Sequence, residues 1–191
     1  MDLILASTSA YRRNLLERLQ IPFLTLTPEV DESPLPDESA SALAYRLAEQ
    51  KSLNIAQRHP EAIVIGSDQV ASLSGDCIGK PGTHQAAVEQ LLKSSGQRVD
   101  FYTGLSITCL DTNYSQTLVE RFSVIFRTLE PVEIENYLTK EKPYDCAGSF
   151  KCEGLGIALF DKMIGEDPTS LEGLPLIATC RLLREAGFPV L

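Results

Sequence analysis

The chain has 191 residues, of which 43% are apolar and 23% charged, a composition typical of globular proteins rather than disordered ones. This length can bury one substantial core or form two small lobes. The net charge of −9 argues against binding to a nucleic-acid polymer or an anionic membrane. A small anionic substrate is still compatible with that charge, because a metal ion and a few local cations can build a positive pocket.

The cysteines and the apolar runs indicate a cellular location. The five cysteines include no C-x-x-C pair and there are only two histidines, which favours free thiols in a reducing compartment over a zinc site. The first apolar run, residues 3–6, is too short for a signal peptide. No run approaches the roughly 20 apolar residues of a membrane span. We therefore expect a cytoplasmic protein.

The first half of the chain alternates short apolar strands with helices. Leu15, Leu16 and Leu19 recur at spacings of three and four, which is the pattern of one apolar helix face. The segment at 29–38 is rich in proline and acidic residues and therefore predicts a loop. The other elements predicted here are strands at 3–6 and 23–26 and helices at 11–19 and 39–58.

The second half contains a hairpin and further helices. A strand is predicted at 62–65, ending at Gly66-Ser67-Asp68-Gln69, and 70–73 extend it into a turn. Residues 147–159 are rich in glycine and receive no assignment. The remaining predictions are helices at 83–93, 131–138 and 175–186, and an antiparallel hairpin of 99–108 with 114–126. Alternating strands and helices with an inserted hairpin indicate an α/β or α+β fold with a mixed sheet, as one domain spanning residues 1–191.

A candidate anion-binding turn joins the first strand to the first helix. Ser9 lies at the start of that helix, and Arg12 follows in its first turn. Backbone N–H groups at a helix N-terminus attract anions, and arginine adds donors that suit phosphate. A cation at that end is unfavourable without an anion, because the helix dipole is already positive there. The pattern favours phosphate binding about as strongly as plain capping with solvated arginines.

Two acidic positions are candidate metal ligands. Glu32 lies in the predicted loop, where an acidic residue is either solvated or part of a magnesium-type site. Asp68 follows an apolar strand, at the edge of the sheet where open α/β sheets bind ligands. It could hold a metal or orient an attacking water, and the alternative is a turn aspartate bonded to its own backbone.

Three more charged residues are weaker candidates. Lys80 follows a glycine without P-loop spacing, and Lys51 lies in the middle of the long predicted helix. Each is either a phosphate contact or a solvated surface lysine. Glu153 lies in the glycine-rich segment, where its carboxylate could accept hydrogen bonds from the edge of a base.

Taken in order, these motifs resemble those of the Maf family of nucleoside triphosphate pyrophosphatases. The resemblance covers nearly the whole chain, and it is the ordered set rather than any single motif that is specific. The motifs are Leu3-Ile4-Leu5-Ala6-Ser7-Thr8-Ser9, Arg12-Arg13-Asn14-Leu15-Leu16, Val30-Asp31-Glu32, Ala48-Glu49-Gln50-Lys51, Gly66-Ser67-Asp68-Gln69-Val70, Gly79-Lys80-Pro81, Ala147-Gly148-Ser149-Phe150 and Gly173-Leu174-Pro175.

The resemblance implies a fold and a set of roles. The fold is an elongated mixed sheet flanked by helices, with two lobes, a central cleft and often a homodimeric assembly. The activity is hydrolysis between the α and β phosphates with Mg²⁺ or Mn²⁺. Asp68 takes the role of general base or water-orienting carboxylate and, with Glu32, of metal ligand. The positions implied to bind phosphate are Ser9, Arg12, Lys51 and Lys80.

The resemblance also bears on the substrate. Tyr11, Gln69 and Glu153 are similar to the branch that hydrolyses 7-methyl-GTP, although a tryptophan is common there in place of Tyr11. Methylation at N7 makes guanine cationic, so an aromatic face would attract it by about 0.5–2 kcal/mol. Members acting on dTTP and UTP carry an arginine at position 11, which would repel such a base. The alternatives are a dTTP or UTP pyrophosphatase, a nucleotide-binding regulator of cell division, and an acidic adaptor protein.

Overall fold

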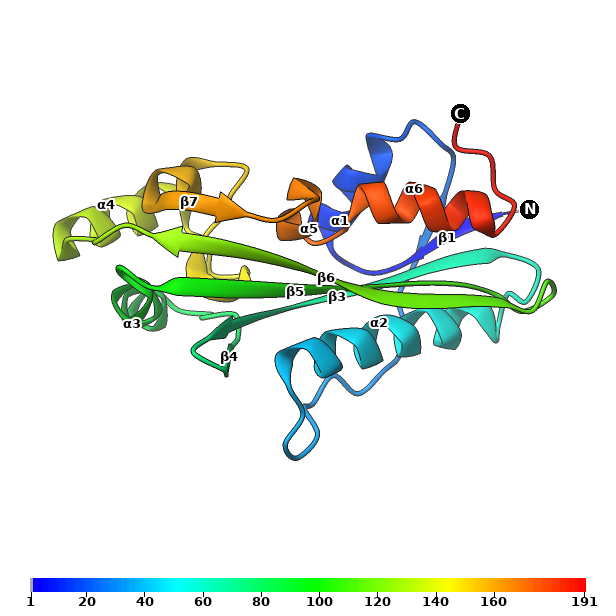
Figure 1. Ribbon diagram of the computed structural model, residues 1–191, viewed down its shortest axis with the longest axis horizontal. Coiled ribbons are helices and arrows are strands. Elements are labelled where there is room, and N and C mark those ends of the chain that lie inside the picture. Colours follow the sequence, from blue (N-terminus) through cyan, green and yellow to red (C-terminus); the bar gives the residue numbers. More distant parts are fainter. Residues whose placement is uncertain (1) are drawn as a thin grey trace. The chain divides into compact units, whose positions relative to one another are not determined.

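The computed structural model describes residues 2–191, whose strands form one seven-stranded sheet. The strands are hydrogen-bonded in the order β2 (Leu24–Leu26), β1 (Leu3–Ala6), β3 (Ile63–Leu73), β5 (Arg98–Cys109), β6 (Tyr114–Phe126) and β7 (Phe160–Ile164), and β4 (Asp76–Ile78) pairs with β3 (Figure 1). Strand β1 pairs in parallel with β2 and β3, whereas β4 and β7 pair antiparallel with β3 and β6. The sheet is therefore mixed, as the sequence predicts. By its contacts the chain divides into two compact units.

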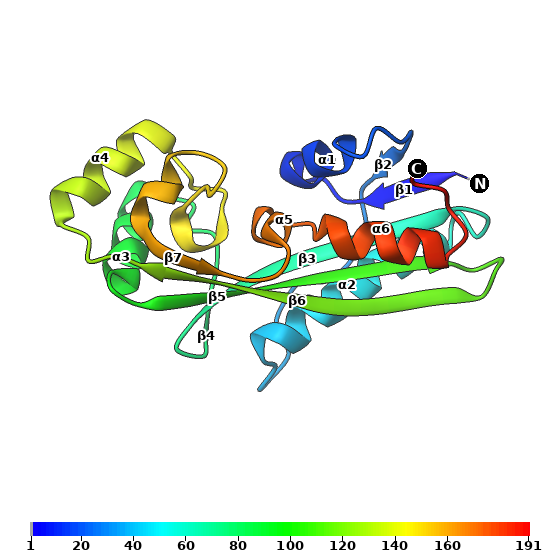
Figure 2. The ribbon, with the colours of Figure 1, turned by 45° about the horizontal axis from the view of Figure 1, so that its top comes forward.

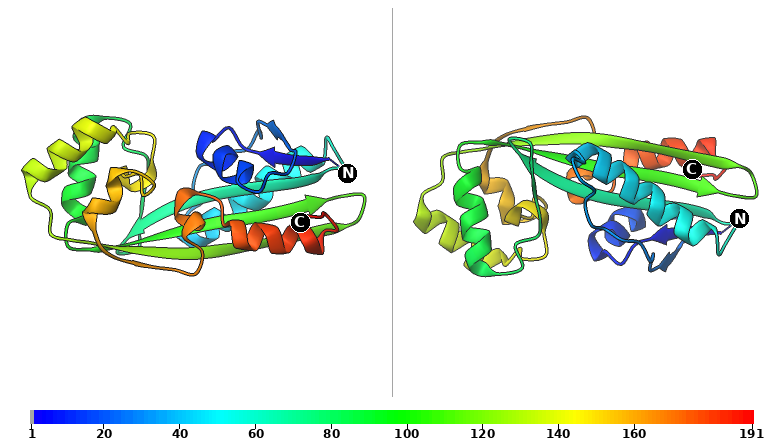
Figure 3. Two further views of the ribbon diagram at one scale, coloured as in Figure 1. Left: turned by 90° about the horizontal axis from the view of Figure 1, so that it is seen from above. Right: turned by 90° about the horizontal axis from the view of Figure 1, so that it is seen from below.

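The first unit comprises Met1–Gln69, Thr103–Glu120 and Asp167–Leu191. Its helices cover both faces of the sheet, with α2 on one face and α1 and α6 on the other (Figures 1 and 3). The elements that lie wholly within it are β1 (Leu3–Ala6), α1 (Ala10–Glu17), β2 (Leu24–Leu26), α2 (Ala40–Ala56), α5 (Pro168–Glu172) and α6 (Leu176–Glu185).

The core of this unit follows the two-residue alternation of its strands. Odd-numbered residues of β1 and β3 (Ile63–Leu73), such as Leu5 and Ile65, join the cluster that also contains α1 and α6. Even-numbered residues, such as Ile4 and Val64, pack with Ile55 of α2. Alternate residues of a strand face opposite sides of a sheet, so the parity of a residue in β3 predicts which helices it meets.

Two glycines let α2 approach the sheet closely. A Cβ atom on Gly66 would overlap the carbonyl oxygen of Ala48, and one on Gly104 would overlap that of Ala44. Neither position needs a left-handed backbone; what it requires is the absence of a side chain. Close backbone approach by α2 brings the middle of this helix against β3 and thereby places Lys51.

The second unit comprises Val70–Tyr102 and Arg121–Glu166. Helices α3 (His84–Ser94) and α4 (Pro131–Glu141) lie side by side in it (Figure 2). Four phenylalanines make edge-to-face contacts with centroids 4.8–5.8 Å apart, and they form the aromatic part of its core: Phe101, Phe126, Phe150 and Phe160. The strands β5 (Arg98–Cys109) and β6 (Tyr114–Phe126) contribute to both units.

The structure corrects one expectation and adds elements. The strand predicted at 62–65 continues to Leu73, so Gly66 does not end it; the glycine accommodates α2 instead. The unassigned 147–159 segment contains two short 3₁₀ helices. Three elements lacked a prediction: β4 (Asp76–Ile78), β7 (Phe160–Ile164) and α5. Among residues 2–191, no helix is long and apolar enough to cross a membrane.

Candidate active site

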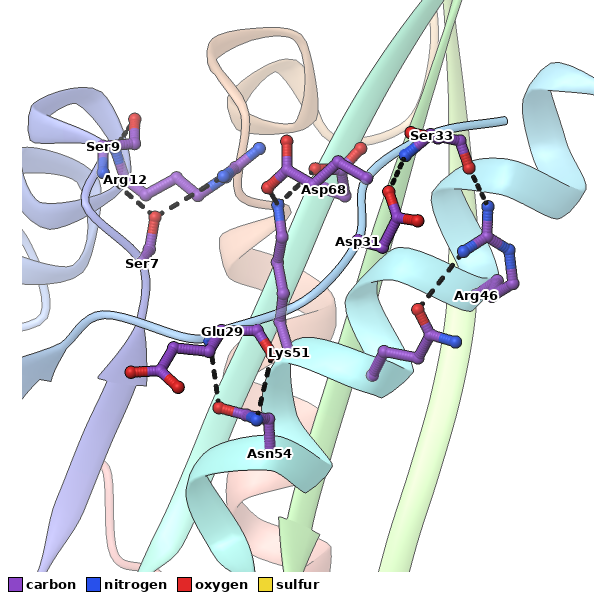
Figure 4. A network of polar contacts seen from close by, with 12 residues as sticks. Ser7, Ser9, Arg12, Glu29, Asp31, Ser33, Arg46, Lys51, Asn54 and Asp68 are labelled. Carbon is purple, nitrogen blue, oxygen red and sulfur yellow. Dashed lines mark hydrogen bonds and ion pairs between the residues drawn. The ribbon is translucent and has the colours of Figure 1, made fainter. Parts of the chain in front are cut away.

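The centre of the candidate site is Lys51, an ammonium held between two carboxylates. Its Nζ donates to Oδ1 of Asp68 at 2.7 Å and lies 2.6 Å from Oε1 of Glu32 (Figure 4). The side chains of Lys51 and Asp68 are 6% and 12% exposed, whereas that of Glu32 is 62% exposed. Burial of Lys51 is tolerable because both carboxylates compensate its charge. The alternative of a solvated surface lysine is therefore wrong for Lys51.

Asp68 lies within β3, not after it. The parallel pairing of β1 with β3 ends at Ala6 and Gly66, so Asp68 extends two residues past the end of β1. Its even position points it to the α2 side, toward Lys51. The alternative of a turn aspartate bonded to its own backbone is thus wrong. Asp68 does lie just past the carboxyl end of β1, the strand that pairs in parallel with β3, which is the edge where a ligand site was expected.

The loop that carries Glu32 is hydrogen-bonded to α2 both before and after that residue. Before it, Glu29 and Asn54 exchange two hydrogen bonds of 3.1 Å between backbone and side chain. After it, Arg46 donates to the carbonyl oxygen of Ser33 at 3.0 Å. Arg46 in turn forms a two-pronged ion pair with Glu38 at 2.7 and 2.8 Å. These contacts place an exposed acidic loop over the buried end of Lys51 (Figure 4).

The turn from β1 into α1 presents a half-buried arginine. Ser9 caps α1 by accepting a hydrogen bond from the backbone N–H of Arg12. The Arg12 guanidinium donates to the carbonyl oxygen of Gly173 at 2.9 Å and to Ser7 Oγ at 3.5 Å. Burial lowers the pKa of Arg12, and the negative charges of Asp68 and Glu32 act in the opposite direction. The alternative of a solvated arginine is therefore wrong for Arg12. Its guanidinium interacts electrostatically with Asp68 and Glu32, the two carboxylates that contact Lys51.

Gln69 faces the opposite side of β3 from Asp68. Its Nε2 donates to the carbonyl oxygens of Ser170 and Leu171 in α5, at 2.8 and 3.1 Å, and to Thr103 Oγ1 at 3.1 Å. Its amide nitrogen is thus engaged by the protein itself. Tyr11, at the second position of α1, is half-buried.

Lys80 and Glu153 belong to the second unit. Lys80 is exposed in the loop after β4, and Glu153 is exposed between the two 3₁₀ helices. The structure does not test their expected contacts with phosphate and base, which stay predictions.

Some residues around the site carried no specific sequence prediction. Ser67 Oγ is fully buried and donates to the carbonyl oxygens of Gly104 and Gly173, at 2.8 and 3.0 Å. Gly173 O therefore accepts from both Ser67 and Arg12. A serine next to the candidate base was visible in the sequence, but its distant partners were not. Gly173 has a φ of 114°, where glycine is favoured.

The donors of the site fit a hard divalent cation. Magnesium is usually held by one or two carboxylates together with substrate phosphates and water, and Glu32 and Asp68 supply two carboxylates that both contact Lys51. Within residues 2–191, no group of three or more histidine, cysteine, aspartate or glutamate side chains is placed to hold a metal. Substrate phosphates and water would complete the coordination of a cation held by these two carboxylates.

Comparison with known proteins gives consistent results. Residues 2–186 match the family model described as Maf-like protein. Three similar proteins are each named 7-methyl-GTP pyrophosphatase. They come from Polaromonas sp. strain JS666 (54% identity, covering 97% of this chain and 84% of that protein), Xanthomonas axonopodis pv. citri (57%, 98% and 98%) and Nitrosococcus oceani (51%, 99% and 95%).

Among solved structures, protein VC0702 from Vibrio cholerae is similar over 98% of both chains, with 11% identity and a TM-score of 0.43, too weak a likeness for any conclusion. The family model, in contrast, matches nearly the whole sequence, and the relatives exceed half identity over almost its full length. The chain therefore belongs to the Maf family.

Proposed function

We propose that this protein hydrolyses 7-methyl-GTP to 7-methyl-GMP and pyrophosphate, and so removes a modified nucleotide from the cytoplasmic pool. The observation that carries the proposal is the shared name of three relatives that are 51–57% identical over at least 97% of the chain. We further propose that residues 1–191 act as one Maf-like domain, assemble as a homodimer, and bind neither a nucleic-acid polymer nor a membrane.

The buried ion pair supports a role for Asp68 as the base. Lys51 donates to Oδ1, so we assign the contact with the attacking water to Oδ2. As the water oxygen bonds to the α-phosphorus, Oδ2 accepts the water proton. The bond from the α-phosphorus to the oxygen that bridges to the β-phosphorus breaks, and pyrophosphate leaves with that bond's electron pair. A positioned carboxylate of this kind typically contributes about 10²- to 10⁴-fold to the rate.

The cations are proposed to bind the triphosphate. Arg12 is held by Gly173 and Ser7, so its guanidinium is already oriented before an anion arrives. Lys51 compensates the charges of Glu32 and Asp68 and would shift toward phosphate oxygens as they enter. Ser9 fixes the first turn of α1. Lys80 keeps the phosphate role that the resemblance implies.

Glu32 and Asp68 are the residues proposed to hold Mg²⁺ or Mn²⁺. When bound, the cation would neutralise charge on the phosphate oxygens and stabilise the developing negative charge. Glu32 is exposed on a loop that is fixed at both ends, so it can reach a solvated ion without rearrangement of α2.

Base recognition is proposed to involve Tyr11, Gln69 and Glu153. Tyr11 supplies an aromatic face for the cationic 7-methylguanine ring, and the exposed carboxylate of Glu153 is an acceptor for the guanine edge. The Gln69 amide is bonded to α5, so its contribution is the shape of that region rather than a direct donor.

The test is pyrophosphate release from GTP, 7-methyl-GTP, dTTP, UTP and dITP with Mg²⁺ or Mn²⁺. Strong preference for 7-methyl-GTP is expected. Preference for dTTP or UTP would retain the chemistry and overturn the base assignment. No release from any nucleotide would contradict the enzymatic proposal and favour a nucleotide-binding regulator of cell division.

A further inference from the structure

Gln90, on α3, connects two motifs of the second unit, at Gly79 and Ser149, that lie about 70 residues apart in the sequence. Its Nε2 donates to the carbonyl oxygen of Gly79 at 3.1 Å, and its Oε1 accepts from Ser149 Oγ at 2.5 Å. Gly79 directly precedes Lys80, and Ser149 belongs to the Ala147–Ser149 turn. Both functional groups of one amide are thus used to join these two segments.

The turn at Ser149 is held in an unusual backbone conformation. Gly148 and Ser149 have φ values of 77° and 63°, and the second is rare for a residue with a side chain. A Cβ on Gly148 would lie 3.2 Å from Phe101, so the aromatic core leaves little room for another arrangement. Ser149 is fully buried. The strained conformation aims its hydroxyl at Gln90, and such strain is concentrated at functional sites.

The Lys80 loop is anchored at its two ends. Gln90 holds the carbonyl of Gly79, and the backbone N–H of Gly82 donates to the carbonyl oxygen of Tyr144 at 2.9 Å. Only Lys80 and Pro81 lie between those two anchors. The two glycines would otherwise make the loop conformationally free. Gln90 is therefore the side chain that fixes the backbone immediately before Lys80.

We propose that Gln90, oriented by Ser149, is a positioning residue that holds Lys80 ready for a substrate phosphate. It acts through the carbonyl of Gly79 and does not touch the substrate. The proposal rests on the proposed function, in which Lys80 binds phosphate. Its purpose is preorganisation, because a lysine on a fixed loop loses less freedom when the anion binds.

The test is a double-mutant cycle between Gln90→Glu and Lys80→Ala, measured as KM and kcat for 7-methyl-GTP. Glutamate keeps the acceptor for Ser149 and removes the donor to Gly79. The single variant Q90E is expected to raise KM by about 5- to 30-fold, the loss expected for one hydrogen bond, with kcat changed much less. In the K80A background, Q90E should raise KM no further.

Gln85→Glu is the matched control, because it makes the same change on the same helix at an exposed residue whose amide donates to Glu89 at 3.5 Å. It should leave KM unchanged, which excludes a general effect of added negative charge. Equal effects of Q90E with and without Lys80, or a change confined to kcat, would overturn the proposal. If Q90E does not fold, Ser149→Ala takes its place in the cycle with the same expected result. If the wild-type protein showed no turnover of 7-methyl-GTP, that result would instead refute the proposed function.

Discussion

Lys51 and Asp68 form a buried ion pair although they come from a helix and a strand 17 residues apart, with Nζ 2.7 Å from Oδ1. The pair depends on the close approach of α2 that Gly66 and Gly104 permit. A buried pair is weak evidence for stability, since well-packed apolar residues often stabilise as much. The position of the pair, with Asp68 two residues past the β1 pairing and Glu32 also contacting Lys51, is more simply explained by chemistry than by folding.

Asp68→Asn is expected to reduce turnover by at least about 100-fold while leaving the fold intact. The amide oxygen can still accept from Lys51, so the buried ammonium keeps a partner. Steady-state kinetics and thermal unfolding, measured together, check this. Asp31→Asn, in the exposed loop, is the control and should retain activity. Wild-type turnover in Asp68→Asn would remove Asp68 from the role of base.

Ser67→Ala is expected to weaken substrate binding through Arg12. It removes the hydroxyl from the carbonyl oxygens of Gly104 and Gly173, and the Gly173 carbonyl orients the guanidinium. Loss of a buried hydrogen-bonding group costs about 1–3 kcal/mol of stability. Unfolding by urea should show that loss, and KM should rise more than kcat falls.

Ser72→Ala is the comparison for Ser67→Ala, because Ser72 is also a buried serine of β3. It should affect KM little. Equal KM values for Ser67→Ala and the wild type would show that the orientation of Arg12 does not depend on the hydroxyl of Ser67.

The sequence predicted single helices and strands well, but it did not predict the contacts between them. The expected helix at 39–58 is α2, because its apolar spacing and its Ser39 cap are local features. The contact of Lys51 with Asp68 depends on which helix covers which face, and this is settled only by packing. The position of Glu32 depends on contacts of Asn54 and Arg46 with the loop, which no spacing indicates.

The elements that the sequence analysis did not predict differ in how clearly the sequence indicates them. Helix α5 has only five residues, too few for an apolar period, but Asp167 followed by Pro168 is a typical helix start that could have identified it. Strand β7 has no buried residue within it, so alternation could not reveal it. The family resemblance gave Gln69 a role in substrate choice. Only the structure shows that its amide is hydrogen-bonded to α5.

Asp167→Ala is expected to destabilise the protein by about 2–4 kcal/mol, because one carboxylate serves two helices. Oδ1 accepts from the N–H and hydroxyl of Thr169 in α5, and Oδ2 accepts from the N–H of Ile177 in α6 at 2.8 Å. Asp167 is 4% exposed, so water cannot replace it. Urea unfolding measures the loss. The exposed Asp161→Ala should change the free energy of unfolding by less than about 0.5 kcal/mol.

Tyr11→Arg is expected to lower kcat/KM for 7-methyl-GTP by about 3- to 30-fold, the range that corresponds to a cation–π contact. An arginine would also repel the cationic base. Kinetics with 7-methyl-GTP and GTP separate the two effects, since GTP lacks the ring charge and should lose less. Tyr45→Arg, which adds the same charge at an exposed position of α2, should have little effect. Equal losses for both nucleotides would contradict stacking with the cationic ring.

Glu38→Gln is expected to flatten the dependence of stability on acid pH. Hydrogen bonds from Arg46, and then from the backbone of Leu35, lower the pKa of Glu38 from 4.5 to about 2. Between these values the unfolded chain binds a proton that the folded chain does not. The contribution of Glu38 is therefore complete above about pH 4.5 and is lost as the pH falls toward about 2.

Urea unfolding of the wild type and Glu38→Gln across that range checks the prediction, with the exposed Glu61→Gln as control. The free energy of unfolding of the wild type should fall more steeply with acid than that of Glu38→Gln, and Glu61→Gln should follow the wild type. Because the same Arg46 holds Ser33, acid should also loosen the loop that carries Glu32. Parallel pH profiles for the wild type and Glu38→Gln would mean that this ion pair does not persist in solution.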